Sequence, residues 1–153
     1  MTDVAQGQPL PPTIARLLDR FRRMSREEKM QALVQYAKRL EPLPERFRGL
    51  DRAPFSVPEC QTRVDLFPEV RDGKMYFHAD LDPRASPTIA AFLGIVFGAV
   101  NGQPPSTTLA IPPDFVGSMM EGLGLATREV GLNAMVTRLK RHAREAQASD
   151  SEG

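Results

Sequence analysis

A twelve-residue apolar stretch, IAAFLGIVFGAV at positions 89–100, constrains the fold of this chain more than any other feature. It is too short to cross a bilayer, which requires about 20 apolar residues. Because it is apolar nearly all round, it predicts a helix buried at the centre of a domain. Ser86 and Pro87 are suited to its first turn, with Ser86 as the N-cap, and Asn101-Gly102 to its end. A chain of 153 residues, 41% of them hydrophobic, is long enough to cover such a helix within one domain.

Helical spacing of apolar residues predicts further helices before and after the central one. The helix over residues 25–40 opens with Ser25 and Glu28, a capping-box pair that satisfies free amides at a helix start. It must end near residue 40 because two prolines follow. An earlier helix covers residues 14–21, a short one residues 115–121, and the last begins near residue 127. The residues expected on their buried faces are Ile14, Leu17, Leu18 and Phe21, then Met30, Leu33, Val34 and Ala37, then Leu132, Met135, Val136 and Leu139.

Between residues 64 and 80 the apolar period changes to two, which indicates strands. Asp72-Gly73 is a tight-turn signal, so residues 64–70 and 74–80 are expected to pair as an antiparallel hairpin. Pro68 favours an edge position or a bulge. A third strand is expected either beside Cys60 or at residues 109–111. The predicted fold class is therefore α+β, a small antiparallel sheet of about three strands packed against several helices.

One domain is expected over residues 12–146, with a disordered segment at 1–11 and a disordered tail at 147–153. A net charge of +1 gives no general attraction to nucleic acid or to an anionic membrane. The N-terminus lacks the basic and apolar regions of a signal peptide, and a single cysteine cannot form an internal disulfide. We therefore expect a cytoplasmic protein. The sequence contains no P-loop, no dinucleotide fingerprint and no Cys/His metal spacing, so no cofactor or metal is expected.

The single cysteine, Cys60, lies in the stretch VPECQTRVDLF between a long proline-rich loop and the first strand. Its neighbours Pro58, Glu59, Gln61 and Arg63 are a poor setting for a core residue. A free thiol exposed in a reducing cell is unusual unless it is used. Arg63 and Arg52 are candidates to lower the thiol pKa, and Glu59 opposes them.

Other candidate chemistry has a simpler explanation. A Cys–His pair with His78 or His142 is conceivable, but both histidines are expected on polar surfaces. Asp80 and Asp82 are more easily explained as turn caps than as catalytic carboxylates. The last helix carries a basic face that is expected to be solvated, with docking of an acidic partner as the second interpretation and nucleic-acid binding as the third. Its cations are Arg128, Arg138, Lys140, Arg141 and Arg144.

A lone thiol with no second cysteine, metal or assured base is suited to carrying sulfur as a persulfide, which needs only one sulfur atom of the protein. Thiol–disulfide catalysis typically requires a resolving cysteine, and acyl transfer requires a base and an oxyanion site.

The chain resembles the SufE family of sulfur acceptors for cysteine desulfurases, which includes CsdE. The resemblance rests on EEKMQALVQYAKRLEPLP, on VPECQTRV, on KMYFHAD followed by SPTIAAFLGIVFGAVNGQPP, and on the last helix with Arg128 and Gly131-Leu132. It implies a SufE-like fold, with Cys60 as the persulfide acceptor. Gln61 belongs to the same motif, Arg128 matches an arginine near the cysteine-bearing surface, and Arg63 is a further supporting residue. Glu59 departs from the glycine common before the cysteine, and Thr62 stands where serine is common.

The resemblance also implies partners: a SufS-like cysteine desulfurase that carries pyridoxal phosphate, and a SufBCD-like scaffold for iron–sulfur clusters. The chain would then be a sulfur-transfer protein and desulfurase activator rather than a stand-alone enzyme, a monomer or weak dimer with no cofactor of its own. In the family the cysteine can retreat into an apolar pocket. The alternative from another class is a non-catalytic module that docks an acidic partner through its basic C-terminal helix. A Cys–His hydrolase is a third alternative.

Overall fold

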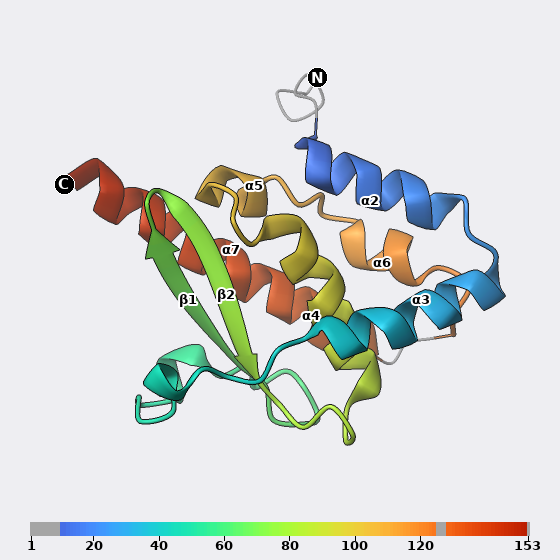
Figure 1. Ribbon diagram of the computed structural model, residues 1–153, viewed down its shortest axis with the longest axis horizontal. Helices are drawn as coiled ribbons and strands as arrows, with labels where there is room; N and C mark the ends of the chain where they lie inside the picture. The colour runs from blue at the N-terminus through green and yellow to red at the C-terminus, as the bar shows by residue number, and fades with distance from the viewer. Residues whose placement is uncertain (1–9, 125–127, 153) are drawn as a thin grey trace.

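The computed structural model describes residues 10–124 and 128–152, and all elements named below lie in these ranges. The described residues form six α-helices and one antiparallel hairpin (Figure 1). The helices are α2 (Pro12–Arg22), α3 (Arg26–Arg39), α4 (Pro87–Val100), α5 (Pro105–Leu109), α6 (Phe115–Met120) and α7 (Glu129–Glu152), and the strands are β1 (Asp65–Arg71) and β2 (Lys74–Asp80). The predicted α+β class is confirmed.

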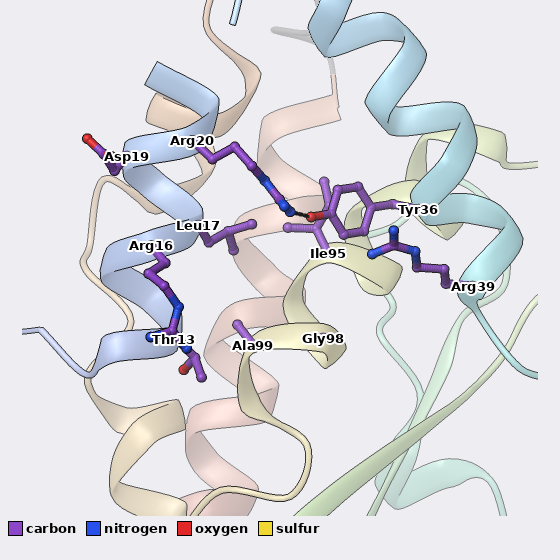
Figure 2. A pocket seen from close by; sticks show the side chains of 10 residues that line it. All are labelled: Thr13, Arg16, Leu17, Asp19, Arg20, Tyr36, Arg39, Ile95, Gly98 and Ala99. Carbon is purple, nitrogen blue, oxygen red and sulfur yellow. Dashed lines mark hydrogen bonds between the residues drawn. The ribbon is translucent and has the colours of Figure 1, made fainter. Parts of the chain in front are cut away.

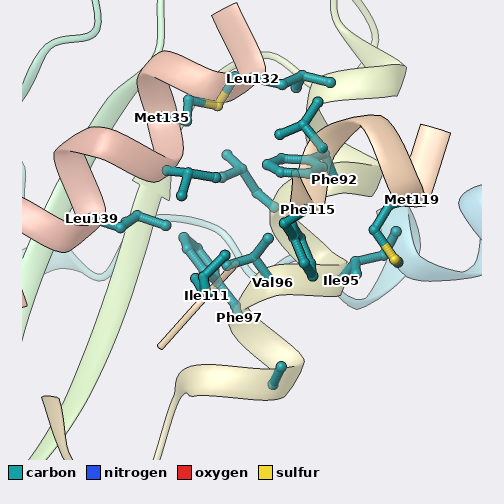
Figure 3. Packing of buried hydrophobic residues seen from close by; sticks show 14 of the residues in the cluster. Phe92, Ile95, Val96, Phe97, Ile111, Phe115, Met119, Leu132, Met135 and Leu139 are labelled. Carbon is teal, nitrogen blue, oxygen red and sulfur yellow. The ribbon is translucent and has the colours of Figure 1, made fainter. Parts of the chain in front are cut away.

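Helix α4 lies at the centre of the domain, as its apolar sequence predicts. It contacts α2 and α3 on one side and β2 on another, while α7 runs behind it and packs along β1 (Figure 1). Phe92 and Val96 of α4 meet Phe115 of α6 and the fully buried Leu132 and Met135 of α7 (Figure 3). Each such side chain contributes about 1.5–3 kcal/mol through its removal from water. Five elements, α2, α3, α6, α7 and β2, therefore pack against α4.

Helix α3 begins with the predicted capping box. The Glu28 amide donates to Ser25 Oγ at 3.2 Å, and the Ser25 amide donates to Glu28 Oε1 at 2.8 Å. Of the residues predicted on the buried face of α3, Leu33 is buried, which confirms the prediction for that residue. Met30 and Val34 are exposed, so the prediction is wrong for these two. The backbones of α3 and α4 come close together at Tyr36 and Gly94. This contact turns Leu33 and Tyr36 toward the core, so Met30 and Val34 face outward.

The hairpin forms with the predicted turn. Asp65 pairs with Asp80 and Arg71 with Lys74, and Asp72 and Gly73 both have positive φ, 54° and 76°, as a type I′ turn requires. The third strand does not form among the described residues. The segment before β1 contributes one bridge, Ser56 to Asp65, and then turns at Pro58, which has no amide to extend a ladder. Residues 109–111 instead form the last residue of the short helix α5 and the turn after it.

The loop between α3 and β1 contains two short 3₁₀ turns, η1 (Glu45–Phe47) and η2 (Ala53–Phe55). Leu43 and Phe47 pack with Phe67 of β1 in a small second cluster, so this loop covers one face of the hairpin.

The ends of the domain differ in part from expectation. Residues 1–9 lie outside the described residues, and so does the predicted start of the last helix at 127. Helix α7 continues to Glu152, so the predicted disordered tail from residue 147 is replaced by helix. The sequence from 132 to 152 has no glycine or proline to end it. None of the described helices has both the length and the apolar character needed to span a membrane.

Candidate functional site

Cys60 lies in a small loop that is closed at its base. The Val57 amide donates to the Val64 carbonyl at 3.0 Å, and the Cys60 amide donates to the Val57 carbonyl at 3.2 Å. Strand β1 begins at Asp65, so the thiol lies in a turn that precedes the strand. We call residues 57–64 the cysteine loop. Its backbone hydrogen bonds give the loop a defined shape although it lies outside the sheet.

A cluster of four charges holds the base of the cysteine loop. Arg52 donates to Asp65 at 3.0 Å and also to Asp80, while Arg63 donates to Asp65 at 3.0 Å and to Asp80 at 3.1 Å. The Asp65 side chain is only 2% exposed, and a buried carboxylate requires such partners. Arg52 and Arg63 are therefore engaged with aspartates, and the expectation that they lower the pKa of Cys60 is wrong.

The far side of the cysteine loop is tied to the start of α4. Thr62 Oγ1 and Ser86 Oγ lie 2.5 Å apart and share a hydrogen bond. Ser86 stands at the predicted N-cap position, but its side chain makes no hydrogen bond to the helix amides, because its hydroxyl is used by Thr62. Pro87 has no amide to be capped, which reduces the cost of this arrangement.

The thiol faces a cavity of about 260 Å³ between the cysteine loop and the start of α7. Cys60 is half-buried, and its Sγ lies 3.8 Å from the Gly131 carbonyl oxygen. A Cβ atom added at Gly131 would lie 3.1 Å from that Sγ, so a glycine at this position lets the sulfur approach the helix. The residues lining the cavity are Glu59, Cys60, Gln61, Ile89, Arg128, Val130, Gly131, Leu132 and Met135.

Two of the predicted supporting residues, Gln61 and Arg128, thus lie with Cys60, whereas Arg63 does not. Burial raises the pKa of the Cys60 thiol, Glu59 raises it further, and Arg128 lowers it. The net pKa lies above the usual range, so the thiol is protonated at neutral pH in this conformation. A change in its surroundings that relieves this burial would raise the fraction of nucleophilic thiolate.

Glu59 has a partner that the sequence does not reveal. Its carboxylate lies 3.7 Å from Arg138 Nη2, and the Arg138 side chain is only 25% exposed. Lys140 donates to the Ile111 carbonyl at 2.6 Å, and burial lowers its pKa. The expectation of one solvated basic face on the last helix is therefore wrong for these two residues. Arg141 faces Glu145 at 3.7 Å.

The spacing of residues from Arg128 into α7 is the sequence signal that indicates a place for Arg138 at the site. Arg128, Gly131, Met135 and Arg138 recur three or four residues apart, which puts them on one helix face.

Neither histidine lines the cavity of Cys60. His142 is buried, 6.1 Å from the ring of Phe55, and burial lowers its pKa, so the expectation of an exposed His142 is wrong. The η2 turn supplies the covering ring. His78 is half-buried, with Nε2 2.9 Å from Glu69 Oε1. The described site thus provides no Cys–His pair.

Among the residues that the structure describes, no group of three or more His, Cys, Asp and Glu side chains is arranged to hold a metal ion.

Comparison with known proteins agrees with this architecture. The sequence pattern of SufE, an Fe-S metabolism associated domain, matches residues 15–143. An uncharacterized SufE-like protein of Mycobacterium tuberculosis is 32% identical over 145 residues, which cover 90% of this chain and 95% of the relative. One from Synechocystis is 28% identical over 114 residues, covering 74% of this chain and 68% of the relative.

The solution structure of a hypothetical protein from Thermus thermophilus superimposes with a TM-score of 0.77 at 30% identity, covering 92% of this chain and 99% of that one. The chain therefore belongs to the SufE family, whose domain is associated with Fe–S metabolism.

Proposed function

We propose that Cys60 accepts a sulfur atom as a persulfide from a cysteine desulfurase and passes it on for iron–sulfur cluster assembly. One observation carries this proposal. The chain's single thiol sits on a tied loop at a partly apolar cavity, beside Arg128 and without a histidine base among the lining residues. That arrangement suits a sulfur carrier better than a hydrolase, which needs a base and an oxyanion site.

The transfer follows the chemistry of thiol–disulfide exchange. Cys60 loses its proton, and its thiolate attacks the outer sulfur of the donor's persulfide. A new S–S bond forms on Cys60 while the S–S bond of the donor breaks. The donor's cysteine leaves as a thiolate and takes up a proton, so one sulfhydryl and one persulfide exchange places without net oxidation. The donor is then free for another turnover, which makes this chain its activator.

The surroundings of Cys60 suggest how its residues contribute. Arg128 favours the thiolate and Glu59 disfavours it. Docking that draws the cysteine loop away from Gly131 would relieve burial, the largest cause of the raised pKa. Gln61 lines the same cavity, while Arg63 acts on the loop base. The cavity of about 260 Å³ offers shelter for a bound sulfur atom from reductants.

In this proposal the chain carries no cofactor, and pyridoxal phosphate belongs to the SufS-like donor. A SufBCD-like scaffold is the onward acceptor.

The test is incubation of the chain with a cysteine desulfurase and free cysteine, followed by intact-mass measurement. One added sulfur atom is expected on the wild type and none on Cys60→Ser. We expect Arg128→Gln to slow the addition, whereas Arg141→Gln removes the same charge from α7 outside the cavity and leaves the rate unchanged. Wild type that gains no sulfur, or a Cys60→Ser variant that gains as much, would refute the proposal.

A further inference from the structure

A second cavity lies where α2, α3 and the C-terminal half of α4 meet, away from Cys60. Its volume is about 450 Å³, within the range of small-molecule sites. The floor is apolar, formed by Leu17, Ile95 and Ala99, and arginines surround it (Figure 2). It shares no lining residue with the cysteine cavity. Ile89 of that cavity and Gly98 of this one are nine residues apart on α4, about 13.5 Å along the helix at 1.5 Å per residue.

Gly98 contributes open space to the wall of this cavity. Glycine in a helix costs about 0.5–1 kcal/mol relative to alanine, and α4 contains two. Gly94 is required by packing, because a Cβ atom there would lie 2.2 Å from the Tyr36 carbonyl oxygen. Gly98 has no such reason, since a Cβ atom there would meet nothing within 4 Å. It lines this cavity and also a neighbouring depression of about 330 Å³. Its missing side chain therefore preserves space rather than a contact.

Three arginines from two helices line the cavity. Arg16 and Arg20 come from consecutive turns of α2, and Arg39 comes from the end of α3. The Arg20 guanidinium donates to the Tyr36 hydroxyl, and the Arg39 guanidinium lies 4.7 Å from the centre of the Tyr36 ring (Figure 2). Tyr36 itself is buried. One fixed aromatic residue thus positions two cations before any ligand arrives.

No carboxylate within the described ranges 10–124 and 128–152 forms an ion pair with any of these three arginines. The one acidic residue at the rim, Asp19, points away from the cavity (Figure 2) and lies 3.3 Å from Arg23. Thr13 Oγ1 is buried in the wall without a hydrogen-bond partner among the described residues. The site therefore has an excess of positive charge and unused donors.

We propose that this cavity binds a small organic phosphomonoester. A phosphate group carries a charge of about −1.5 to −2, which matches clustered guanidinium groups better than a single carboxylate does. Guanidinium groups bind its oxygens in pairs. The volume exceeds what a phosphate needs, and the apolar floor with the Tyr36 ring accommodates an apolar or aromatic body. This inference is independent of the proposed role of Cys60.

The test is titration of the ¹⁵N-labelled full chain with phenyl phosphate, followed by NMR. We expect shifts concentrated at residues 13–20, 36–39 and 95–99, and a dissociation constant on the order of 1 mM or tighter from at least two charge-assisted hydrogen bonds. Inorganic phosphate should bind more weakly and phenol should not bind. Equal binding of inorganic phosphate would overturn the requirement for an organic body, and absence of phenyl phosphate binding would overturn the site.

Two pairs of variants separate a built site from general surface charge. Arg16→Gln with Arg39→Gln should weaken phenyl phosphate binding by about tenfold or more. Arg22→Gln with Arg26→Gln removes the same charge from exposed positions outside the cavity and should change binding less than about twofold. Gly98→Leu should abolish binding by filling the cavity, whereas Gly98→Ala adds one methyl group and should retain it. The proposal would be overturned if the two arginine double variants lost equal affinity for phenyl phosphate, or if Gly98→Ala lost as much affinity as Gly98→Leu.

Discussion

Substitution of Gly94 by alanine tests the closest contact in the fold. The added Cβ atom would lie 2.2 Å from the Tyr36 carbonyl oxygen and 2.9 Å from its carbon, where ordinary contact begins at 3.4 Å. Helices α3 and α4 would have to separate by about 1.2 Å, because a backbone carbonyl cannot swing aside as a side chain does. Overpacking of this kind costs about 1–3 kcal/mol or more.

The matched control is Gly98→Ala in the next turn of the same helix. Its Cβ atom meets nothing within 4 Å, so the variant should gain the helix preference of alanine, about 0.5–1 kcal/mol. Gly94→Ala gains the same preference and still should lose about 2 kcal/mol net at the upper end of the overpacking range. The two variants should therefore differ by about 3 kcal/mol.

Urea denaturation followed by far-UV circular dichroism measures this difference as a change in midpoint at constant slope. In thermal unfolding it corresponds to roughly 2–4 °C for each kcal/mol in a chain of this size. The reasoning is refuted if Gly94→Ala proves as stable as Gly98→Ala. Such a result would mean that α3 and α4 do not approach each other through Gly94.

Three further predictions concern the described side chains. Glu59→Gln should lower the pKa of Cys60 and Arg128→Gln should raise it, as read from the pH dependence of iodoacetamide alkylation; shifts in the opposite directions would contradict the assignment. Gly131→Ala should displace the sulfur from α7 and speed alkylation, whereas Gly117→Ala, whose Cβ atom meets nothing within 4 Å, should not. Because burial lowers the pKa of His142, unfolding free energy should hold above the unfolded histidine pKa of about 6.5 and fall as pH drops below it. His142→Gln should flatten that decline, and an unchanged slope would refute the link.

Local sequence signals predicted the elements that depend on local chemistry. The capping box of α3, the Asp72-Gly73 turn and the apolar helix α4 are confirmed because each depends on neighbouring residues alone. The exposure of Met30 and Val34 depends instead on where α3 meets Gly94, a residue far along the chain.

The site shows the same division. The neighbours of Cys60 in the sequence single it out, whereas Gln61 and Arg128 follow from the family resemblance. The structure places all three at one cavity. Arg63 was expected to act on the thiol, but its partners Asp65 and Asp80 come together only when the hairpin forms. The cover that Phe55 provides for His142 likewise depends on tertiary packing. Periodicity cannot show such contacts, because they join separate elements.

The closed base of the cysteine loop has a consequence for the entropy of docking. Ordering a free segment costs about 1–2 kcal/mol per residue in backbone freedom. The Val57–Val64 hydrogen bond and the charge cluster at Asp65 order the cysteine loop when the chain folds. The backbone entropy of the loop is therefore lost during folding and is not lost again when a partner docks. A partner that moves Cys60 then needs to exchange the side-chain contacts of Cys60 with Gly131, of Glu59 with Arg138 and of Thr62 with Ser86. The loop can therefore move as a hinged unit, so that most of the free energy of association remains available for affinity.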